Sequence, residues 1–323
     1  MKKSSLIIGV DGGGSYTTGY IFDINGNTIE KIIIEGTNLS IYKELAISRL
    51  ADLLKQLTRK NSLSLEDISA IGFGLSGVSD LDQRELLLKE LDKLKISHKS
   101  LILSDAEIAF NLLCPVGIGI LVCIGTGVIC LARDENGKTY RIAGEGYDKD
   151  IGSGYWIGKQ AIDRILLNSG LISIDSDLNE IYNLILKKNN ISDLNDLSNV
   201  LLDEKQSVYK IALLSKDIID LAERGNDVAL SIIQEATRNI GDYIINLLDK
   251  LKFSNKDVII SGHGSVLKNT FYRKLLNQSL EFEINNLQWL LSNISPAYTA
   301  GIMAAAARNI NVSIEDVVKN IKN

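Results

Sequence analysis

The chain has few of the residues that build disulfide frameworks, metal sites or rigid turns, with three cysteines, two histidines and two prolines among 323 residues. Cys114, Cys123 and Cys130 are odd in number and lack a Cys-x-x-Cys spacing, so we expect reduced, buried thiols rather than disulfides or a zinc site. No apolar run is long enough to cross a bilayer, and the first one ends at Asp11, too early for an export signal. These absences predict a cytoplasmic protein without a membrane partner.

Strong charge of one sign is also absent. The 35 Lys and Arg residues are outnumbered by 40 Asp and Glu residues, which gives a net charge of -5 and no basic stripe. Such a chain is not suited to neutralising a phosphate backbone, so we expect no nucleic-acid partner. The hydrophobic content of 45% and the length predict a globular protein of two domains.

The first notable stretch is "LIIGVDGGGSYTTGYIFDINGNTIEKIIIEG" at residues 6–36. Apolar runs, a glycine turn and an Asn-Gly pair predict three antiparallel strands joined by tight turns. Gly12, Gly13 and Gly14 can adopt positive φ and leave backbone N–H groups uncovered, which would favour an anion. Asp11, at the end of the strand, is suited to a hydrated cation beside that anion.

The same pattern returns at residues 119–144, "GILVCIGTGVICLARDENGKTYRIAG". A strand, a turn at Gly125, Thr126 and Gly127, a second strand, an Asn-Gly turn and a third strand follow in the same order. Two such hairpins facing each other across a cleft would hold both ends of a polyphosphate, which one alone would not. The chain therefore contains two copies of the same hairpin, which gives a reason for duplication beyond folding.

Three further stretches fit this pattern. Asp105 follows the strand "LILS", at the carboxyl end where α/β folds place reactive groups. "DVIISGHGSVLKN" predicts a strand that breaks at Gly262 and Gly264 into a helix. "SPAYTAGIMAAAARN" predicts a helix that starts at Ser295 and Pro296 and whose small residues suit close packing at a hinge.

Two other glycine motifs are weaker. Gly72, Gly74 and Gly77 form G-x-G-x-x-G, but Gly77 does not open a helix directly and no acidic residue follows at the dinucleotide spacing. "SGYWIGKQ" lacks the first glycine and the final Ser/Thr of a phosphate-binding P-loop. Residues 155–252 instead read as almost wholly helical, with one apolar stripe that we interpret as core: Ile232, Ile233, Ala236, Ile240, Ile244, Leu247 and Leu251.

In their order and spacing, these segments resemble the phosphate 1, connect 1, phosphate 2, adenosine and connect 2 motifs of the actin-like ATPase superfamily. Within it, "DGGGSYT", "SDAEIAF", "IGTG" and "GSGYWIG" are most similar to the N-acetylglucosamine kinase branch of the BadF/BadG/BcrA/BcrD ATPase-like family. The resemblance runs from about Leu6 to Ala307. It implies two actin-like, ribonuclease H-like lobes of duplicated βββαβα topology around a nucleotide cleft.

The resemblance also implies a lobe division, with residues 1–117 as the first lobe, 118–296 as the second, and a helix from 297 to 323 that packs back on the first. We expect a homodimer that binds a small-molecule amino sugar. ATP and Mg²⁺ are the implied cofactors.

The resemblance further implies roles for individual residues. Asp11 would hold Mg²⁺ through water, and Asp105 is our candidate for the base that takes the proton of the acceptor hydroxyl. The candidates for ATP binding are Gly12, Gly13, Gly14, Ser15, Thr17, Gly125, Thr126, Gly127, Gly262, His263, Gly264 and Ser265. The candidates for substrate binding are Asn38, Gly77, Asp105, Thr126, Glu145, Tyr147 and Asp150. We expect His98 and His263 to be solvent-facing loop residues, although His263 is also a neighbour of the predicted adenine site.

The implied activity is phosphorylation of the 6-hydroxyl of N-acetylglucosamine or N-acetylmuramic acid. The segment "GEGYDKDIGSGYWIG" departs from the family pattern, because Glu145 stands about where a tryptophan is expected and Ile151 replaces an acidic residue. A carboxylate in place of an aromatic wall keeps a glucosamine kinase open as an alternative. Two other classes stay open as well: the ATPase that activates 2-hydroxyacyl-CoA dehydratases, and a sugar sensor without catalysis.

Overall fold

The computed structural model describes residues 5–114, 117–193, 196, 204–252, 257–291 and 294–312. The chain divides into two compact units, one formed by Met1–Leu112 with Ser292–Asn323 and the other by Leu113–Leu291. The predicted lobe boundaries at 117/118 and 296/297 stay a prediction. The predicted terminal helix of residues 297–323 is shorter than expected, because it ends at Ala306 and residues 307–312 are not helical, and residues 313–323 lie outside the described residues.

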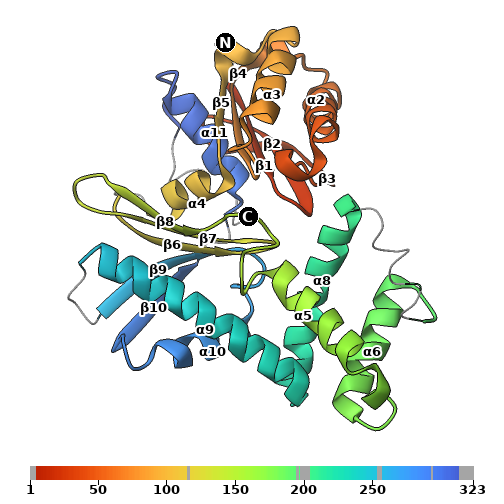
Figure 1. Ribbon diagram of the computed structural model, residues 1–323. Helices are drawn as coiled ribbons and strands as arrows, with labels where there is room; N and C mark the ends of the chain where they lie inside the picture. Colours follow the sequence, from red (N-terminus) through yellow and green to blue (C-terminus); the bar gives the residue numbers. More distant parts are fainter. Residues whose placement is uncertain are drawn as a thin grey trace. The chain divides into compact units, whose positions relative to one another are not determined.

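The first unit contains the elements that carry the first glycine turn (Figure 1). In chain order they are β1 (Leu6–Gly12), β2 (Tyr16–Asp23), β3 (Thr28–Glu35), α1 (Leu39–Tyr42), α2 (Glu44–Arg59), β4 (Ile68–Leu75), α3 (Leu81–Lys93), β5 (Ser100–Leu103), α4 (Asp105–Leu113) and α11 (Pro296–Ala306). Short 3-10 turns at Leu65–Asp67 and Ser97–Lys99 precede β4 and β5.

The five strands of this unit form one sheet in the order β3-β2-β1-β4-β5. β1, β2 and β3 pair antiparallel, which confirms the predicted three-strand meander, whereas β4 and β5 are parallel to β1. In this register Asp11 is opposite Gly74 on β4. The carboxyl ends of β1, β4 and β5 therefore meet at one edge of the sheet.

Both faces of this sheet are covered, which explains why β1 is apolar up to Val10. Ile8 and Val10 belong to a core cluster shared with α2 and α3, and Ile7 belongs to a second cluster shared with α11 (Figure 1). A Cβ at Gly72 would lie 1.9 Å from the carbonyl oxygen of Ala300 in α11. Gly72, the first glycine of the G-x-G-x-x-G sequence, thus allows close helix packing.

The second unit repeats this plan with a larger helical part. Its elements are β6 (Gly119–Ile124), β7 (Val128–Arg133), β8 (Thr139–Ala143), α5 (Gly154–Leu167), α6 (Ser176–Asn189), α8 (Glu204–Glu223), α9 (Asp227–Lys250), β9 (Asp257–His263), α10 (Thr270–Leu280) and β10 (Asn286–Leu291). The sheet order is β10-β9-β6-β7-β8. Read from β8, this is the order of the first sheet, again with three antiparallel strands followed by two parallel ones. The predicted duplicated α/β fold is confirmed.

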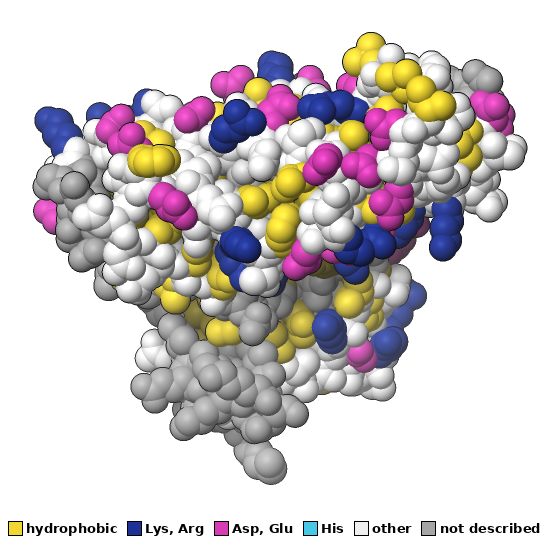
Figure 2. All heavy atoms as spheres, turned by 90° about the horizontal axis from the view of Figure 1, so that it is seen from below, with side chains coloured by type: hydrophobic (Ala, Val, Ile, Leu, Met, Phe, Trp, Pro, Cys, Tyr) yellow, Lys and Arg dark blue, Asp and Glu magenta, His cyan; other side chains and the backbone are white. Residues whose placement is uncertain are grey.

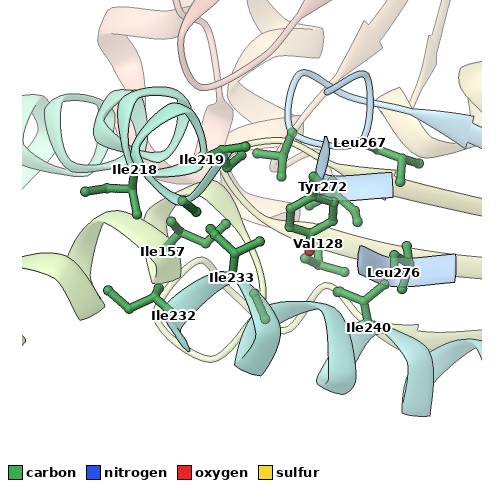
Figure 3. Close-up of a cluster of buried hydrophobic side chains, with 14 of the residues drawn as sticks. Val128, Ile157, Ile218, Ile219, Ile232, Ile233, Ile240, Leu267, Tyr272 and Leu276 are labelled. Carbon is green, nitrogen blue, oxygen red and sulfur yellow. The ribbon is translucent and has the colours of Figure 1, made fainter. Parts of the chain in front are cut away.

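The core of the second unit lies between its sheet and the helices α5, α8, α9 and α10 (Figure 3). Ile232, Ile233 and Ile240 of α9 point into this core together with Tyr272 of α10. The predicted apolar stripe of α9 is confirmed up to Leu247, whereas Leu251 is the half-buried residue that ends the helix. This packing fixes the sheet on which the second glycine turn stands.

The surface carries charges of both signs. On the face drawn in Figure 2, Lys and Arg side chains are interspersed with Asp and Glu side chains. Among the described residues, none of the helices combines the length and the apolar character that crossing a membrane requires.

Candidate active site

The first glycine turn, Gly12–Ser15, lies between β1 and β2 and is held by backbone hydrogen bonds. The carbonyl of Gly12 accepts from the N–H of Ser76 at 2.8 Å, and that of Gly13 accepts from the N–H of Thr37 at 3.0 Å. The Tyr42 hydroxyl donates to the carbonyl of Gly14 at 2.8 Å. Three carbonyls of the turn are therefore held by segments that follow β3 and β4.

These contacts decide where the N–H groups of the turn point. A trans peptide places its N–H opposite its C=O. Because the carbonyls of Gly13 and Gly14 face Thr37 and Tyr42, the N–H groups of Gly14 and Ser15 point away from those two residues. Neighbouring backbone N–H groups in a turn are the kind of donor that an anion can accept from.

The reason for glycine in this turn differs from the prediction. Gly12, Gly13 and Gly14 are not among the glycines with positive φ. At Gly12 space is the constraint instead, because a Cβ there would lie 2.3 Å from Thr37 Oγ1 and 2.6 Å from Leu75 Cδ2, whereas at Gly13 a Cβ would lie an ordinary 3.6 Å from the carbonyl oxygen of Tyr16. Thr17 is fully buried behind the turn, where its hydroxyl shares a 2.8 Å hydrogen bond with the hydroxyl of Thr37.

Asp105 is the first residue of α4, directly beyond the end of β5, and is half-buried. One carboxylate oxygen, Oδ2, accepts a hydrogen bond from the Ser76 hydroxyl, and the other, Oδ1, accepts from the N–H of Ala106 at 2.9 Å. The helix itself is capped by Ser104 and Glu107, whose side chains bond to each other's backbone N–H groups at 3.1 and 2.9 Å. The carboxylate of Asp105 is thus not required as the helix cap.

The same sheet edge holds the predicted sugar residues of the first unit. Asn38 begins α1, and its side-chain oxygen accepts from the N–H of Ile41 at 3.1 Å. Gly77 has a φ of 77°, and a Cβ there would lie 2.6 Å from the same Asn38 oxygen. The edge therefore gathers the predicted site residues of this unit, from Asp11 and the turn to Asn38, Gly77 and Asp105.

The second glycine turn, Gly125–Gly127, lies between β6 and β7 and is held mainly by the start of α5. The N–H of Gly125 donates to the carbonyl of Gly127 at 2.9 Å, which closes the turn. The N–H groups of Gly154 and Tyr155 donate to the carbonyls of Gly125 and Thr126 at 2.8 and 3.1 Å. The turn is thus fixed to the first residues of a helix.

Asp150, predicted as a sugar contact, is a buried support of this turn, with only 4% of its surface exposed. Its Oδ2 accepts from the N–H of Val128 at 3.2 Å, and its Oδ1 accepts from the N–H groups of Gly144 and Glu145 at 2.8 and 3.1 Å. Burial raises the pKa of Asp150, and these three N–H groups oppose that rise. Both carboxylate oxygens are therefore engaged within the second unit.

Glu145 and Tyr147 lie in the segment that Asp150 fixes. Glu145 is exposed, and its backbone is tied to Asp150 as described. The Tyr147 ring packs edge-on against that of Tyr155, with ring centroids 4.8 Å apart. Since the N–H of Tyr155 also bonds to Thr126, Tyr147 is placed next to the second glycine turn.

The predicted adenosine segment differs from expectation in where the strand ends. β9 continues through Gly262 and His263 and breaks only at Gly264, and α10 begins six residues later at Thr270 rather than directly. A Cβ at Gly264 would lie 2.2 Å from the carbonyl oxygen of Ile124. The same oxygen accepts a hydrogen bond from the N–H of Val266 at 3.1 Å. The segment that contains Ser265 is thereby fixed beside the residue that precedes the second glycine turn.

His263 is a strand residue, and the expectation of a solvent-facing loop residue was wrong for it. It is opposite Cys123 in the pairing of β6 and β9. Burial, with the positive charge of Lys268 as a smaller cause, lowers the pKa of His263 to about 4. His98, in contrast, is exposed in the 3-10 turn before β5.

The three cysteines are free thiols. Cys114 and Cys130 are buried, and burial raises the pKa of both, whereas Cys123 is only half-buried, contrary to expectation. Within the described residues no group of three His, Cys, Asp or Glu side chains is arranged to hold a metal ion.

Sequence reasoning missed Ser76, Thr37 and Tyr42, which hold the first turn or Asp105. A signal existed for Ser76, since it directly follows β4, the strand between β1 and β5. No local pattern marks Thr37 or Tyr42, because their partners lie 20 to 28 residues earlier in the chain.

Comparisons with known proteins agree with this arrangement. The chain is 29% identical over 280 residues to an N-acetylmuramic acid/N-acetylglucosamine kinase of Clostridium acetobutylicum, covering 84% of this chain and 90% of that protein. It is 26% identical over 318 residues to an N-acetyl-D-glucosamine kinase of Dictyostelium discoideum, covering 94% and 98%. A solved structure from Porphyromonas gingivalis, provisionally named an N-acetylglucosamine kinase, has the same fold, with a TM-score of 0.67, 18% identity, and coverage of 94% and 100%.

The sequence model of the BadF/BadG/BcrA/BcrD ATPase family matches residues 8–321, which is nearly the whole chain. With the duplicated sheets and the two glycine turns described above, this match identifies the protein as a member of the BadF/BadG/BcrA/BcrD ATPase family.

Proposed function

We propose that this protein is an ATP-dependent amino-sugar kinase that transfers the γ-phosphate of ATP to the 6-hydroxyl of N-acetylglucosamine. The observation that carries the proposal is the edge of the first sheet, where Asp105 shares Ser76 as a hydrogen-bond partner with the glycine turn. The names of the two curated relatives support the class of acceptor.

The turns are assigned to the phosphates of ATP. The N–H groups of Gly14 and Ser15, directed away from Thr37 and Tyr42, are assigned as donors for phosphate oxygens in the first unit. The turn Gly125–Gly127 is assigned to the phosphates in the second unit, where the N–H of Gly125 is already bonded to the carbonyl of Gly127. Gly262–Ser265 borders the adenosine in this assignment. Asp11 offers the hard oxygen ligand that Mg²⁺ prefers, and when bound that ion neutralises charge on the phosphates.

The chemistry assigned to the first unit is proton transfer coupled to phosphoryl transfer. Asp105 accepts the proton of the sugar 6-hydroxyl as that oxygen bonds to the γ-phosphorus. The bond between the γ-phosphorus and the bridging oxygen breaks, and ADP leaves with that electron pair. Asn38, Gly77, Glu145 and Tyr147 are assigned to the sugar, whereas the role we assign to Asp150 is to hold the segment that carries Glu145 and Tyr147.

The order of preference among amino sugars rests on the name of one relative and on one exposed side chain. N-acetylmuramic acid is the second candidate, because the Clostridium relative carries both names. Glucosamine is the third, because exposed Glu145 would favour a cationic amine. We further propose a cytoplasmic homodimer.

A coupled assay of ADP release with Mg-ATP tests the proposal over N-acetylglucosamine, N-acetylmuramic acid, glucosamine, N-acetylmannosamine and glucose. We expect the highest kcat/KM with N-acetylglucosamine. A value at least tenfold higher for glucosamine or glucose than for both acetylated sugars would exclude the N-acetyl assignment and leave the kinase. ADP release that no sugar raises above background would exclude the kinase, and visible absorption of the anaerobically purified protein would then favour the dehydratase activator.

A further inference from the structure

Ser76 lies where the segments of the first unit's candidate site meet. Its N–H donates to the carbonyl of Gly12 in the glycine turn at 2.8 Å. Its carbonyl accepts from the N–H of Leu39, directly after Asn38, at 3.0 Å. Its hydroxyl donates to Oδ2 of Asp105. One residue thus bonds to the phosphate turn, to the candidate sugar segment and to the candidate base.

We propose that Ser76 is a positioning residue, which fixes the carboxylate of Asp105 relative to the glycine turn through its hydroxyl. The two backbone bonds of Ser76 would form with any residue at this position except proline, so they hold the Cα in place whatever the side chain. The N–H of Ala106 donates to Oδ1 of Asp105 at 2.9 Å from within the same helix, and the Ser76 hydroxyl holds Oδ2 from the segment that follows β4. The inference rests on the proposed role of Asp105 as the base.

Two observations indicate that the bond between Ser76 and Asp105 is not needed for folding. The cap of α4 is made by Ser104 and Glu107, so the helix does not depend on it. Both partners are half-buried, so that water can replace the lost hydroxyl. The hydroxyl is therefore a removable group within a site fixed by backbone bonds.

The Ser76 hydroxyl also affects how easily the carboxylate of Asp105 is protonated. A donor aimed at a carboxylate stabilises the ionised form, which is the form that accepts a proton. Its removal should make Asp105 easier to protonate. In the pH profile of kcat/KM, the acidic limb should move to higher pH by about 0.5 to 1 unit.

The test compares Ser76→Ala with Ser76→Thr, which keeps the hydroxyl, and with Ser40→Ala as the matched control. Ser40 is a neighbouring serine whose hydroxyl bonds to the carbonyl of Gly77 at 3.2 Å instead of to a carboxylate. We expect Ser76→Ala to lower kcat by about 5- to 30-fold, leave the KM for ATP within about twofold and shift the acidic limb. Ser76→Thr should recover most of the loss, and Ser40→Ala should leave kcat and the profile unchanged.

A second readout does not depend on kinase activity. Aspartate labelled with ¹³C at the carboxyl carbon gives the titration of Asp105 by NMR, with Asp105→Asn to assign its signal. We expect the titration midpoint to be about 0.5 to 1 unit higher in Ser76→Ala than in wild type and Ser76→Thr. An unchanged midpoint overturns the role of Ser76 whether or not any sugar is phosphorylated. If the midpoint shifts but the protein releases no ADP with any sugar, the hydrogen bond from Ser76 to Asp105 is supported and the proposed kinase function is rejected.

Discussion

The two glycine turns stand on sheets of the same strand order, and backbone N–H groups hold both, but these donors come from different kinds of segment. In the first unit, neutral donors hold the turn: two backbone N–H groups and the Tyr42 hydroxyl. In the second unit, the start of α5 holds the turn, and the buried carboxylate of Asp150 ties the adjoining strand to residues 144 and 145.

The comparison shows which part of a duplicated fold is constrained and which part is open. Backbone hydrogen bonds between strands fix the sheet order, and any donor that reaches a turn can support it. In the first unit the site carboxylate, Asp105, is half-buried and accepts from one hydroxyl and one backbone N–H, whereas in the second unit Asp150 is buried and accepts from three backbone N–H groups. We therefore expect the first unit to supply the chemistry and Asp150 to supply stability.

The largest expected effect concerns Asp105, and it tests whether the first unit supplies the chemistry. Asp105→Asn keeps the shape of the side chain but cannot accept the proton of the sugar. Turnover in the ADP-release assay should fall by about 10² to 10⁴. The melting temperature should change little, because Ser104 and Glu107 still cap the helix. Near-normal turnover in this variant would remove the assignment of Asp105 as the base.

Asp150 should show the opposite result. Asp150→Asn leaves one acceptor oxygen where three N–H groups converge, so at least one buried N–H group loses its partner. We expect a loss of about 3 kcal/mol in the free energy of unfolding, measured by urea titration. Asp148→Asn is the matched control, because Asp148 is exposed in the same segment. Equal stability of the two variants would contradict the supporting role of Asp150.

Much of this arrangement could be predicted from the sequence, and the rest has a physical reason for being hidden. The hairpins, the duplicated order and the stripe of α9 follow from local periodicity and turn residues. The bond from Ser76 to Asp105 joins residues 29 positions apart, and no periodic pattern encodes it. The reason for Gly12 was also hidden, since its constraint is the side chain of Thr37 rather than its own backbone angle.

The pH dependence of stability gives another comparison between the two units, because each has one histidine, His98 in the first and His263 in the second. The folded pKa of His263, about 4, is below the ordinary value of about 6.5. Above pH 6.5 the residue is neutral in both states, and between pH 6.5 and 4 only the unfolded state takes up the proton. Stability is therefore lost as the pH falls through this window, by about 2 kcal/mol between pH 8 and pH 5.

His263→Gln should flatten this acid limb, measured as the difference in the free energy of urea unfolding between pH 8 and pH 5. His98→Gln is the matched control, because His98 is exposed in the first unit. A limb that stays as steep in His263→Gln as in wild type would show that other groups cause the loss.

The smallest expected effect compares the two turns directly by adding one methyl group to each. A Cβ at Gly12 would lie 2.3 Å from Thr37 Oγ1, whereas one at Gly125 would have no atom of the described residues within 4 Å apart from its own chain neighbours. Neither glycine has a positive φ, so space alone distinguishes the two sites. Gly12→Ala must displace both Thr37 and Leu75 and should lower the free energy of unfolding by about 1.5 kcal/mol. Gly125→Ala should remain within about 0.5 kcal/mol of wild type. Equal stability of the two variants in thermal and urea unfolding would contradict this prediction. It would show that the first turn can move to accommodate the added methyl group, and that the two turns do not differ in how tightly they are packed.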